Sequence, residues 1–116
     1  MSRSHAKLSL RIYLGEEIAL GPGKADLLDA IVEAGSITEA GKRLGMSYKR
    51  AWMLVDTMNR CFKSTLVETS KGGAARGGAE LTTFGRDVLE RYRAMQIAAQ
   101  ASVRDEAKRL EGLLAR

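Results

Sequence analysis

The stretch that most constrains this chain runs from residue 36 to residue 62, SITEAGKRLGMSYKRAWMLVDTMNRCF. Ser36, followed three residues later by Glu39, predicts the start of a helix, because each side chain can satisfy a free backbone N–H of the other residue. Gly45 predicts the end of that helix, because the left-handed conformation that often follows a helix strains any residue with a Cβ. Ser47 then predicts the cap of a second helix. The stretch is therefore expected to form two short helices joined by a tight turn.

Helical spacing gives the second of these helices one apolar face and one polar face. Apolar side chains recur at positions 51, 54, 55, 58 and 62. The other face is mainly basic and hydrogen-bonding, and its residues are Tyr48, Lys49, Arg50, Met53 and Thr57. In the first helix, Ala40 and Gly41 are small enough to let the second helix cross closely. This pattern is typical of a helix-turn-helix, whose second helix enters the DNA major groove, although an ordinary helical hairpin remains an alternative.

Positive charge is concentrated around this stretch. The chain has 116 residues and a formal net charge of +5. Residues 36–77 contain eight Lys or Arg and three Asp or Glu, so this segment alone carries 8 − 3 = +5, and the remaining residues balance at 11 against 11. Such clustering favours a surface that contacts the phosphates of double-stranded DNA.

Composition limits the other classes of function. The hydrophobic content of 45% suits one compact domain. No apolar run is long enough to span a bilayer, and the first residues lack the apolar core of a signal peptide, so we expect a cytoplasmic protein without membrane contact. Cys61 is the only cysteine and His5 the only histidine. We therefore expect no catalytic residues, no metal site and no cofactor.

The segments around the helix-turn-helix predict a mainly α fold with a small β component. Alternating apolar residues predict a hairpin over residues 7–20, and a further helix should start at Pro22 and end at Gly35. Two β-type segments flank the glycine-rich sequence SKGGAARGG and predict a wing over residues 65–82. Lys71 and Arg76 would supply its charge for DNA; a flexible linker is the alternative. Residues 1–82 are thus expected to form a winged helix-turn-helix domain.

Residues 83–116 are expected to form a long helix, uninterrupted to about Leu114, because no proline interrupts them. Apolar positions recur every three or four residues along this helix, further than the small domain could cover. The excess predicts a homodimer. The proposed dimerisation residues are Val88, Tyr92, Met95, Ala99, Val103 and Leu110.

Several motifs resemble the N-terminal domain of the molybdate-responsive ModE-type transcription regulators. They are Gly35-Ser-Ile, the run GMSYKRAW ending at Trp52, Met58-Asn59, the LVE-plus-glycine wing and LTTFG before the long helix. Together they cover roughly residues 8–101. The helix-turn-helix of LysR-type regulators is similar over a shorter pattern, GSxxxA and LTxxG.

The resemblance implies a homodimer that binds a palindromic operator as a sequence-specific transcriptional regulator. The expected DNA contacts are Ser36, Thr38, Ser47, Tyr48, Lys49, Arg50, Trp52, Met53, Lys71 and Arg76. Trp52 lies beside Ala51, so it either touches a base or packs the helix against the wing. Full-length family members continue into molybdate-binding domains, which this chain of 116 residues lacks, so we do not expect it to bind molybdate. A protein-interaction module and a nonspecific DNA-binding protein are the alternative functions.

Overall fold

The computed structural model describes residues 6–70 and 78–115, and within them it is mainly α-helical with two short β-hairpins. The N-terminal part consists of β1 (Ile12–Leu14), β2 (Glu17–Leu20) and α1 (Pro22–Ala34). The centre holds α2 (Ile37–Arg43) and α3 (Tyr48–Cys61). The rest comprises β3 (Val67–Thr69), β4 (Ala79–Leu81), α4 (Thr83–Ser102) and α5 (Arg104–Glu111). This order confirms the predicted winged helix-turn-helix fold.

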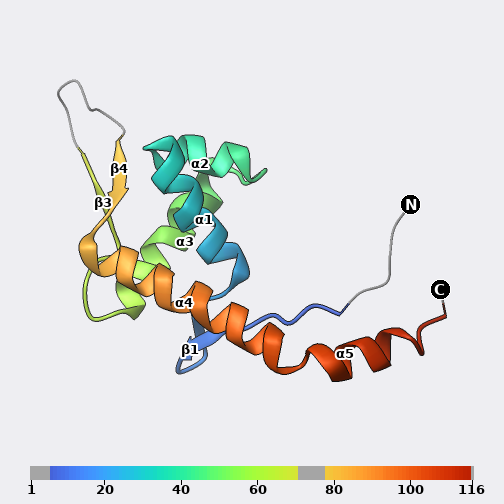
Figure 1. The fold of residues 1–116 in the computed structure, drawn as a ribbon. Helices are drawn as coiled ribbons and strands as arrows, with labels where there is room; N and C mark the ends of the chain where they lie inside the picture. Colours follow the sequence, from blue (N-terminus) through green and yellow to red (C-terminus); the bar gives the residue numbers. More distant parts are fainter. Residues whose placement is uncertain (1–5, 71–77, 116) are drawn as a thin grey trace.

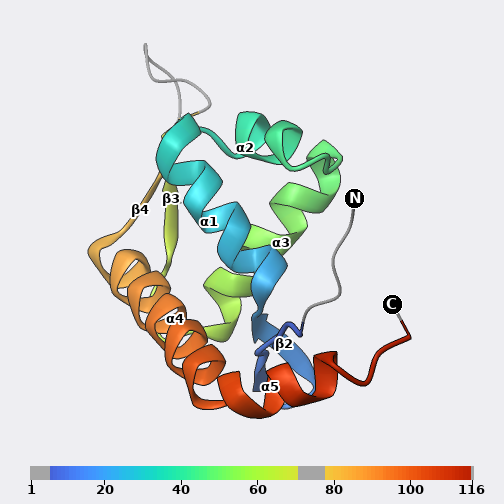
Figure 2. The same ribbon diagram turned by 45° about the vertical axis from the view of Figure 1, so that its right-hand side comes forward.

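Helices α1, α2 and α3 form a bundle, α4 crosses its base, and α5 extends away from it (Figure 1). The antiparallel strands β3 and β4 stand to one side of the bundle, as the turned view also shows (Figure 2). The core is apolar, and its buried side chains come from β2, α1, α2, α3, β3, β4 and α4. Its largest fully buried side chains are Leu20, Leu27, Leu28, Ile31, Ile37, Met58, Leu66 and Tyr92.

The capping and turn residues predicted from the sequence lie at the helix boundaries. The Ser36 Oγ accepts a hydrogen bond from the Glu39 backbone N–H at 3.0 Å, and the Ser47 Oγ accepts one from the Arg50 N–H at 3.1 Å. Gly45, with φ +71°, makes the turn between α2 and α3. These observations confirm the predicted starts of both helices and the turn that joins them.

The close crossing of α2 and α3 depends on a glycine. A Cβ built at Gly41 would lie only 2.9 Å from the Cβ of Ala51. Any larger residue would therefore push the two helices apart. This contact confirms the predicted approach of α2 and α3 at the small residues of α2.

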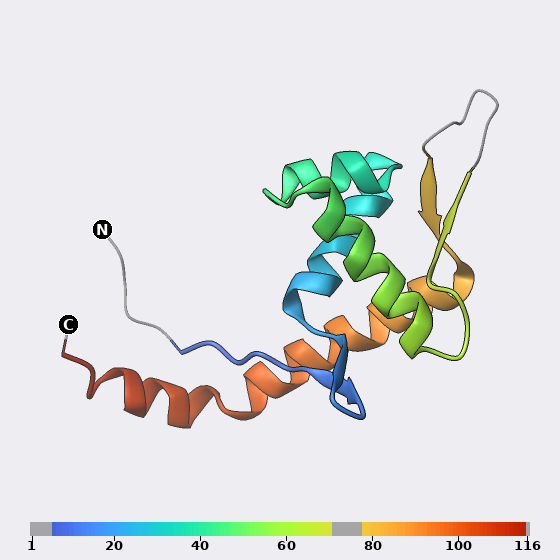
Figure 3. The ribbon, with the colours of Figure 1, turned by 180° about the vertical axis from the view of Figure 1, so that it is seen from behind.

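The predicted N-terminal hairpin is shorter than residues 7–20. Only β1 and β2 pair, and residues 6–11 instead run beside α4 and α5 (Figure 3). The Tyr92 hydroxyl donates a hydrogen bond to the backbone oxygen of Leu10 at 2.7 Å, and the Ala6 N–H donates one to the Glu111 carboxylate at 2.6 Å. The alternating residues before β1 therefore cover a helix instead of pairing with a strand.

The predicted single helix to Leu114 is wrong, because α4 ends at Ser102 and α5 begins at Arg104. Val103 lies between them with φ −110° and ψ 10°, outside helical values. The Ser102 hydroxyl donates to the Ala99 backbone oxygen at 2.8 Å, a side-chain bond of the kind that competes with helical hydrogen bonding. The absence of proline from residues 83–116 was therefore not enough to predict one continuous helix.

Candidate nucleic-acid interface

The outer face of α3 presents a cluster of exposed polar and aromatic side chains. Ser47, Lys49 and Arg50 are exposed at the amino end of the helix. Tyr48 and Met53 are 63% and 53% exposed. This surface can offer hydrogen-bond donors and apolar contacts to base edges in a groove of DNA.

Trp52 belongs to the same surface. Its side chain is 38% exposed, and its ring centroid lies 6.1 Å from that of Tyr48, one helical turn earlier. The tilted pair, with 54° between the ring planes, is held within α3. Trp52 is thus partly accessible while it packs against a neighbouring aromatic residue.

The start of α2 lies next to α3 in the fold. Ser36 is half-buried, and its oxygen already accepts the hydrogen bond from the Glu39 N–H. Thr38, in the first turn of α2, is exposed. Of these two predicted contacts, Thr38 has the freer side chain, while Ser36 chiefly fixes where α2 begins.

The wing strands are attached to α3 through Asn59. Its Oδ1 accepts hydrogen bonds from the backbone N–H groups of Leu66 (2.8 Å) and Val67 (3.1 Å), and its Nδ2 donates to the Val67 backbone oxygen at 3.1 Å. On the other strand, the Ala79 N–H donates to the Gly35 backbone oxygen at 2.8 Å. The strand pair is therefore fixed relative to α3 and to the end of α1. Lys71 and Arg76, the predicted charges of the wing, lie outside the described residues.

Sequence reasoning missed this role of Asn59. The residue follows Met58 on a largely apolar face of α3, and a polar amide there was the available signal.

Two groups of ion pairs tie the elements around α3 together. Arg60 donates to the Glu17 carboxylate at 2.9 Å, which joins α3 to β2, and this hydrogen bond lowers the pKa of Glu17. Arg93 pairs with Asp26 and Asp29, which joins α4 to α1. Burial alone would lower the pKa of Arg93, but its hydrogen bonds to the two carboxylates leave it raised.

A basic groove lies between α3 and the start of α1. It has a volume of about 280 Å³ and is lined by Arg11, Lys24, Arg50 and apolar or backbone groups. Burial lowers the pKa of the Lys24 ammonium, and the positive charge of Arg50 lowers it further, against the opposing effects of Cys61 and Glu17. The sequence analysis did not predict that Arg11 and Lys24 lie at this site, because they are far from α3 along the chain.

The predicted dimerisation residues do not share one exposed face. Tyr92 is 2% exposed and belongs to the core, and Val88 is half-buried against it. Ala99 and Val103 are half-buried too. Assigning Tyr92 to a contact with a second chain must therefore be corrected. Its periodicity came from packing within its own domain.

Met95 and Leu110 are the more accessible members of the predicted set, at 46% and 61% exposure. Met95 lines a small cavity of about 170 Å³ together with Ile12, Phe62 and Tyr92. It therefore lies on the side of α4 that faces the domain's own hairpin.

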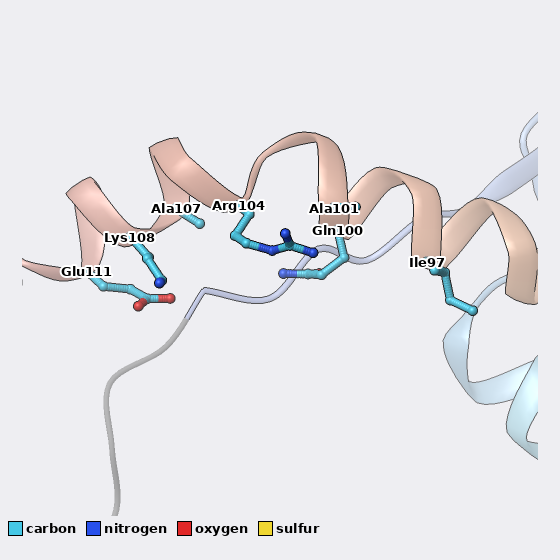
Figure 4. Close-up of a pocket in the computed structure, with 7 residues that line it drawn as sticks. All are labelled: Ile97, Gln100, Ala101, Arg104, Ala107, Lys108 and Glu111. Carbon is cyan, nitrogen blue, oxygen red and sulfur yellow. The ribbon is translucent and has the colours of Figure 1, made fainter.

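A different face of α4 is largely open, although Gln100 and, further along on α5, Glu111 accept hydrogen bonds from the backbone N–H groups of Leu8 and Ala6. Ile97 is 72% exposed and lines two adjoining grooves. The first, about 490 Å³, includes Val32, Leu89 and Ala94. The second, about 420 Å³, continues past Ala101 and Arg104 to α5, and Figure 4 shows its side chains along the two helices. We call the surface of Val32, Leu89, Ala94, Ile97 and Ala101 the α4 groove.

Within residues 6–70 and 78–115, no group of three or more His, Cys, Asp or Glu side chains is arranged to hold a metal ion. None of the helices in that part of the chain is both long enough and apolar enough to cross a membrane.

Comparison with known proteins assigns this chain to a family. The family model for bacterial regulatory helix-turn-helix proteins of the lysR family matches residues 24–86. A molybdenum transport protein ModE of Azotobacter vinelandii is 38% identical over 109 residues, which cover 94% of this chain and 40% of that protein. The DNA-binding transcriptional dual regulator ModE of Escherichia coli K12 is 34% identical over 114 residues, covering 95% and 44%. The chain thus spans less than half the length of these relatives.

Solved structures show a similar fold. The crystal structure of a CbnR_DBD–DNA complex has a TM-score of 0.58 and 26% identity, and the match covers 74% of this chain and 94% of that one. Full-length CbnR complexed with its target DNA has a TM-score of 0.57 and 27% identity, covering 73% and 28%.

Proposed function

This chain belongs to the bacterial regulatory helix-turn-helix proteins of the lysR family, and on that premise we propose that it is a transcriptional regulator that binds specific DNA sequences. The observation that carries the proposal is the outer face of α3, where Tyr48, Lys49 and Arg50 stand exposed at the amino end of the helix. A helix presented in this way by a helix-turn-helix reads base edges in the major groove. Its place of action would be the cytoplasm.

In this proposal the contacts divide into two kinds. Lys49 and Arg50 make the main base contacts, with Ser47, Tyr48, Trp52 and Met53 beside them. Ser36, Thr38 and the wing residues Lys71 and Arg76 contact the DNA backbone and add affinity without reading sequence, unless the wing enters the minor groove. The hydrogen bonds of Asn59 support this arrangement, because they fix the wing strands relative to α3.

Selection of bound sequences from a random duplex pool, followed by anisotropy titrations on the selected and a scrambled duplex, tests the proposal. We expect a selected motif, tighter binding to it than to the scrambled duplex, and a steep fall of affinity with salt. Binding without an enriched motif would instead indicate a nonspecific DNA-binding protein. A lack of binding at low salt would indicate a protein-interaction module.

We further propose that the protein binds its operator as a homodimer through the α4 groove. Ile97 exposes 72% of its surface there, next to Val32 at 44%, and burial against a second copy would remove both from water. A two-fold dimer presents two α3 helices to half-sites about 34 Å apart, or a multiple of that distance, which predicts an inverted-repeat operator.

A further inference from the structure

Three positive side chains from three separate parts of the chain converge on the basic groove beside α3. Arg11 precedes β1, Lys24 lies in the first turn of α1, and Arg50 lies in the first turn of α3. The groove also includes backbone of Gly21 and Gly23. Residues distant in sequence thus place three cations around one volume of about 280 Å³.

No carboxylate in the described part of the chain forms an ion pair with any of these three side chains within 4.0 Å. Arg60 and Arg93, by contrast, each have acidic partners. Unpaired like charges held close together repel one another, and Lys24 is also half-buried. Such an arrangement is stabilised when an anion enters it.

The fold keeps Arg11 at the groove. A Cβ built at Gly21 would lie 3.3 Å from the Cγ of Arg11, so the stem of the arginine lies directly against this glycine. Gly21 is also the cap residue of α1, and it has no side chain to cap the helix. The side chains of Arg11, Lys24 and Arg50 are all hydrogen-bond donors, so the groove suits a ligand with several acceptor oxygens.

The position of the groove indicates where that ligand comes from. The start of α1 lies on one side of α3, and β3 and β4 lie on the other (Figure 3). A duplex lying on the outer face of α3 would have one backbone toward the wing and another toward the basic groove. We propose that Arg11 and Lys24 bind a phosphate of the DNA backbone on the side of α3 opposite the wing, with Arg50 as the shared wall between this groove and the base-reading face. The assignment rests on the DNA binding proposed above.

The test measures how affinity depends on salt. Arg11→Gln and Lys24→Gln each remove one charge while keeping a long side chain. Each should reduce the slope of log affinity against log salt by about 1, to the same extent on selected and scrambled duplexes. Arg11→Lys, which keeps the charge, should restore the wild-type slope. Circular dichroism melts of all variants check that the domain stays folded.

Lys63→Gln is the matched control. It removes the same charge beyond the opposite end of α3, roughly 16 Å or more along the helix from Arg50, and should leave the slope unchanged. Unaltered slopes in the folded Arg11→Gln and Lys24→Gln proteins that still bind DNA would overturn this inference and leave the proposed function intact. Failure of the wild-type protein to bind any duplex at low salt would instead overturn the proposed function, and this inference with it.

A second measurement separates a DNA phosphate from a free one. Inorganic phosphate is titrated into the wild-type protein without DNA, and the amide resonance of Gly23 is followed by NMR. We expect no saturable shift at millimolar phosphate. A saturable shift that is lost in Lys24→Gln, together with an unchanged DNA slope, would make the groove a site for free phosphate and overturn the DNA assignment.

Discussion

The side-chain amide of Asn59 forms hydrogen bonds with both backbone groups of Val67, accepting from its N–H and donating to its oxygen at 3.1 Å each. One side chain of α3 thus satisfies both backbone groups of the first residue of β3. The position of the wing strands relative to the outer face of α3 depends on this contact.

Asn59→Ala should therefore lower the free energy of unfolding by about 1–3 kcal/mol, because it leaves backbone groups of Leu66 and Val67 without their partner. Urea denaturation measures the loss. Lys42→Ala, at an exposed position of α2, is the control and should change stability by less than about 0.5 kcal/mol. Equal effects of the two changes would show that water replaces the Asn59 bonds without cost.

Gly85→Ala should destabilise the fold by about 1–3 kcal/mol, even though alanine favours helices. A Cβ at this position would collide with the backbone oxygen of Leu66, so α4 or the segment before β3 must move. In Gly23→Ala the new Cβ meets nothing within 4 Å, and this variant should be neutral or more stable by up to about 1 kcal/mol. Thermal melts of the two variants compare them directly, and a stable Gly85→Ala protein would refute the close approach.

Arg50→Ala tests which residues read sequence. If Arg50 makes a bidentate base contact, its removal should cost about 1–3 kcal/mol of binding free energy on the selected duplex and much less on a scrambled one. Anisotropy titrations at one salt concentration give both values. Equal losses on the two duplexes would assign Arg50 to a phosphate, in line with its place in the wall of the basic groove.

Ile97→Glu should shift the protein from dimer to monomer, because a carboxylate in the α4 groove would lose its hydration on association. Met95→Glu is the matched change on the other side of α4 and should leave the dimer intact. Sedimentation equilibrium distinguishes the two. A dimer that persists in Ile97→Glu and dissociates in Met95→Glu would place the contact at the dimerisation residues predicted from the sequence.

Local signals in the sequence determined the elements that carry the proposed interface. Ser36, Ser47 and Gly45 act on backbone groups within three or four residues, so their effects could be predicted without knowing the fold. Helical spacing likewise identified the outer face of α3, because that face depends only on which residues of the same helix are buried.

Tertiary structure decided the contacts between residues that are distant along the chain. The periodicity of α4 could not reveal that residues 6–11 cover part of its apolar stripe, with Tyr92 bonded to Leu10 across 82 positions. The anchoring of β3 by Asn59 and the meeting of Arg11, Lys24 and Arg50 also depend on how separate elements pack. The periodicity of apolar residues predicts which side chains of a helix are buried. It does not predict which other segment buries them, because that depends on how all segments of the chain pack together.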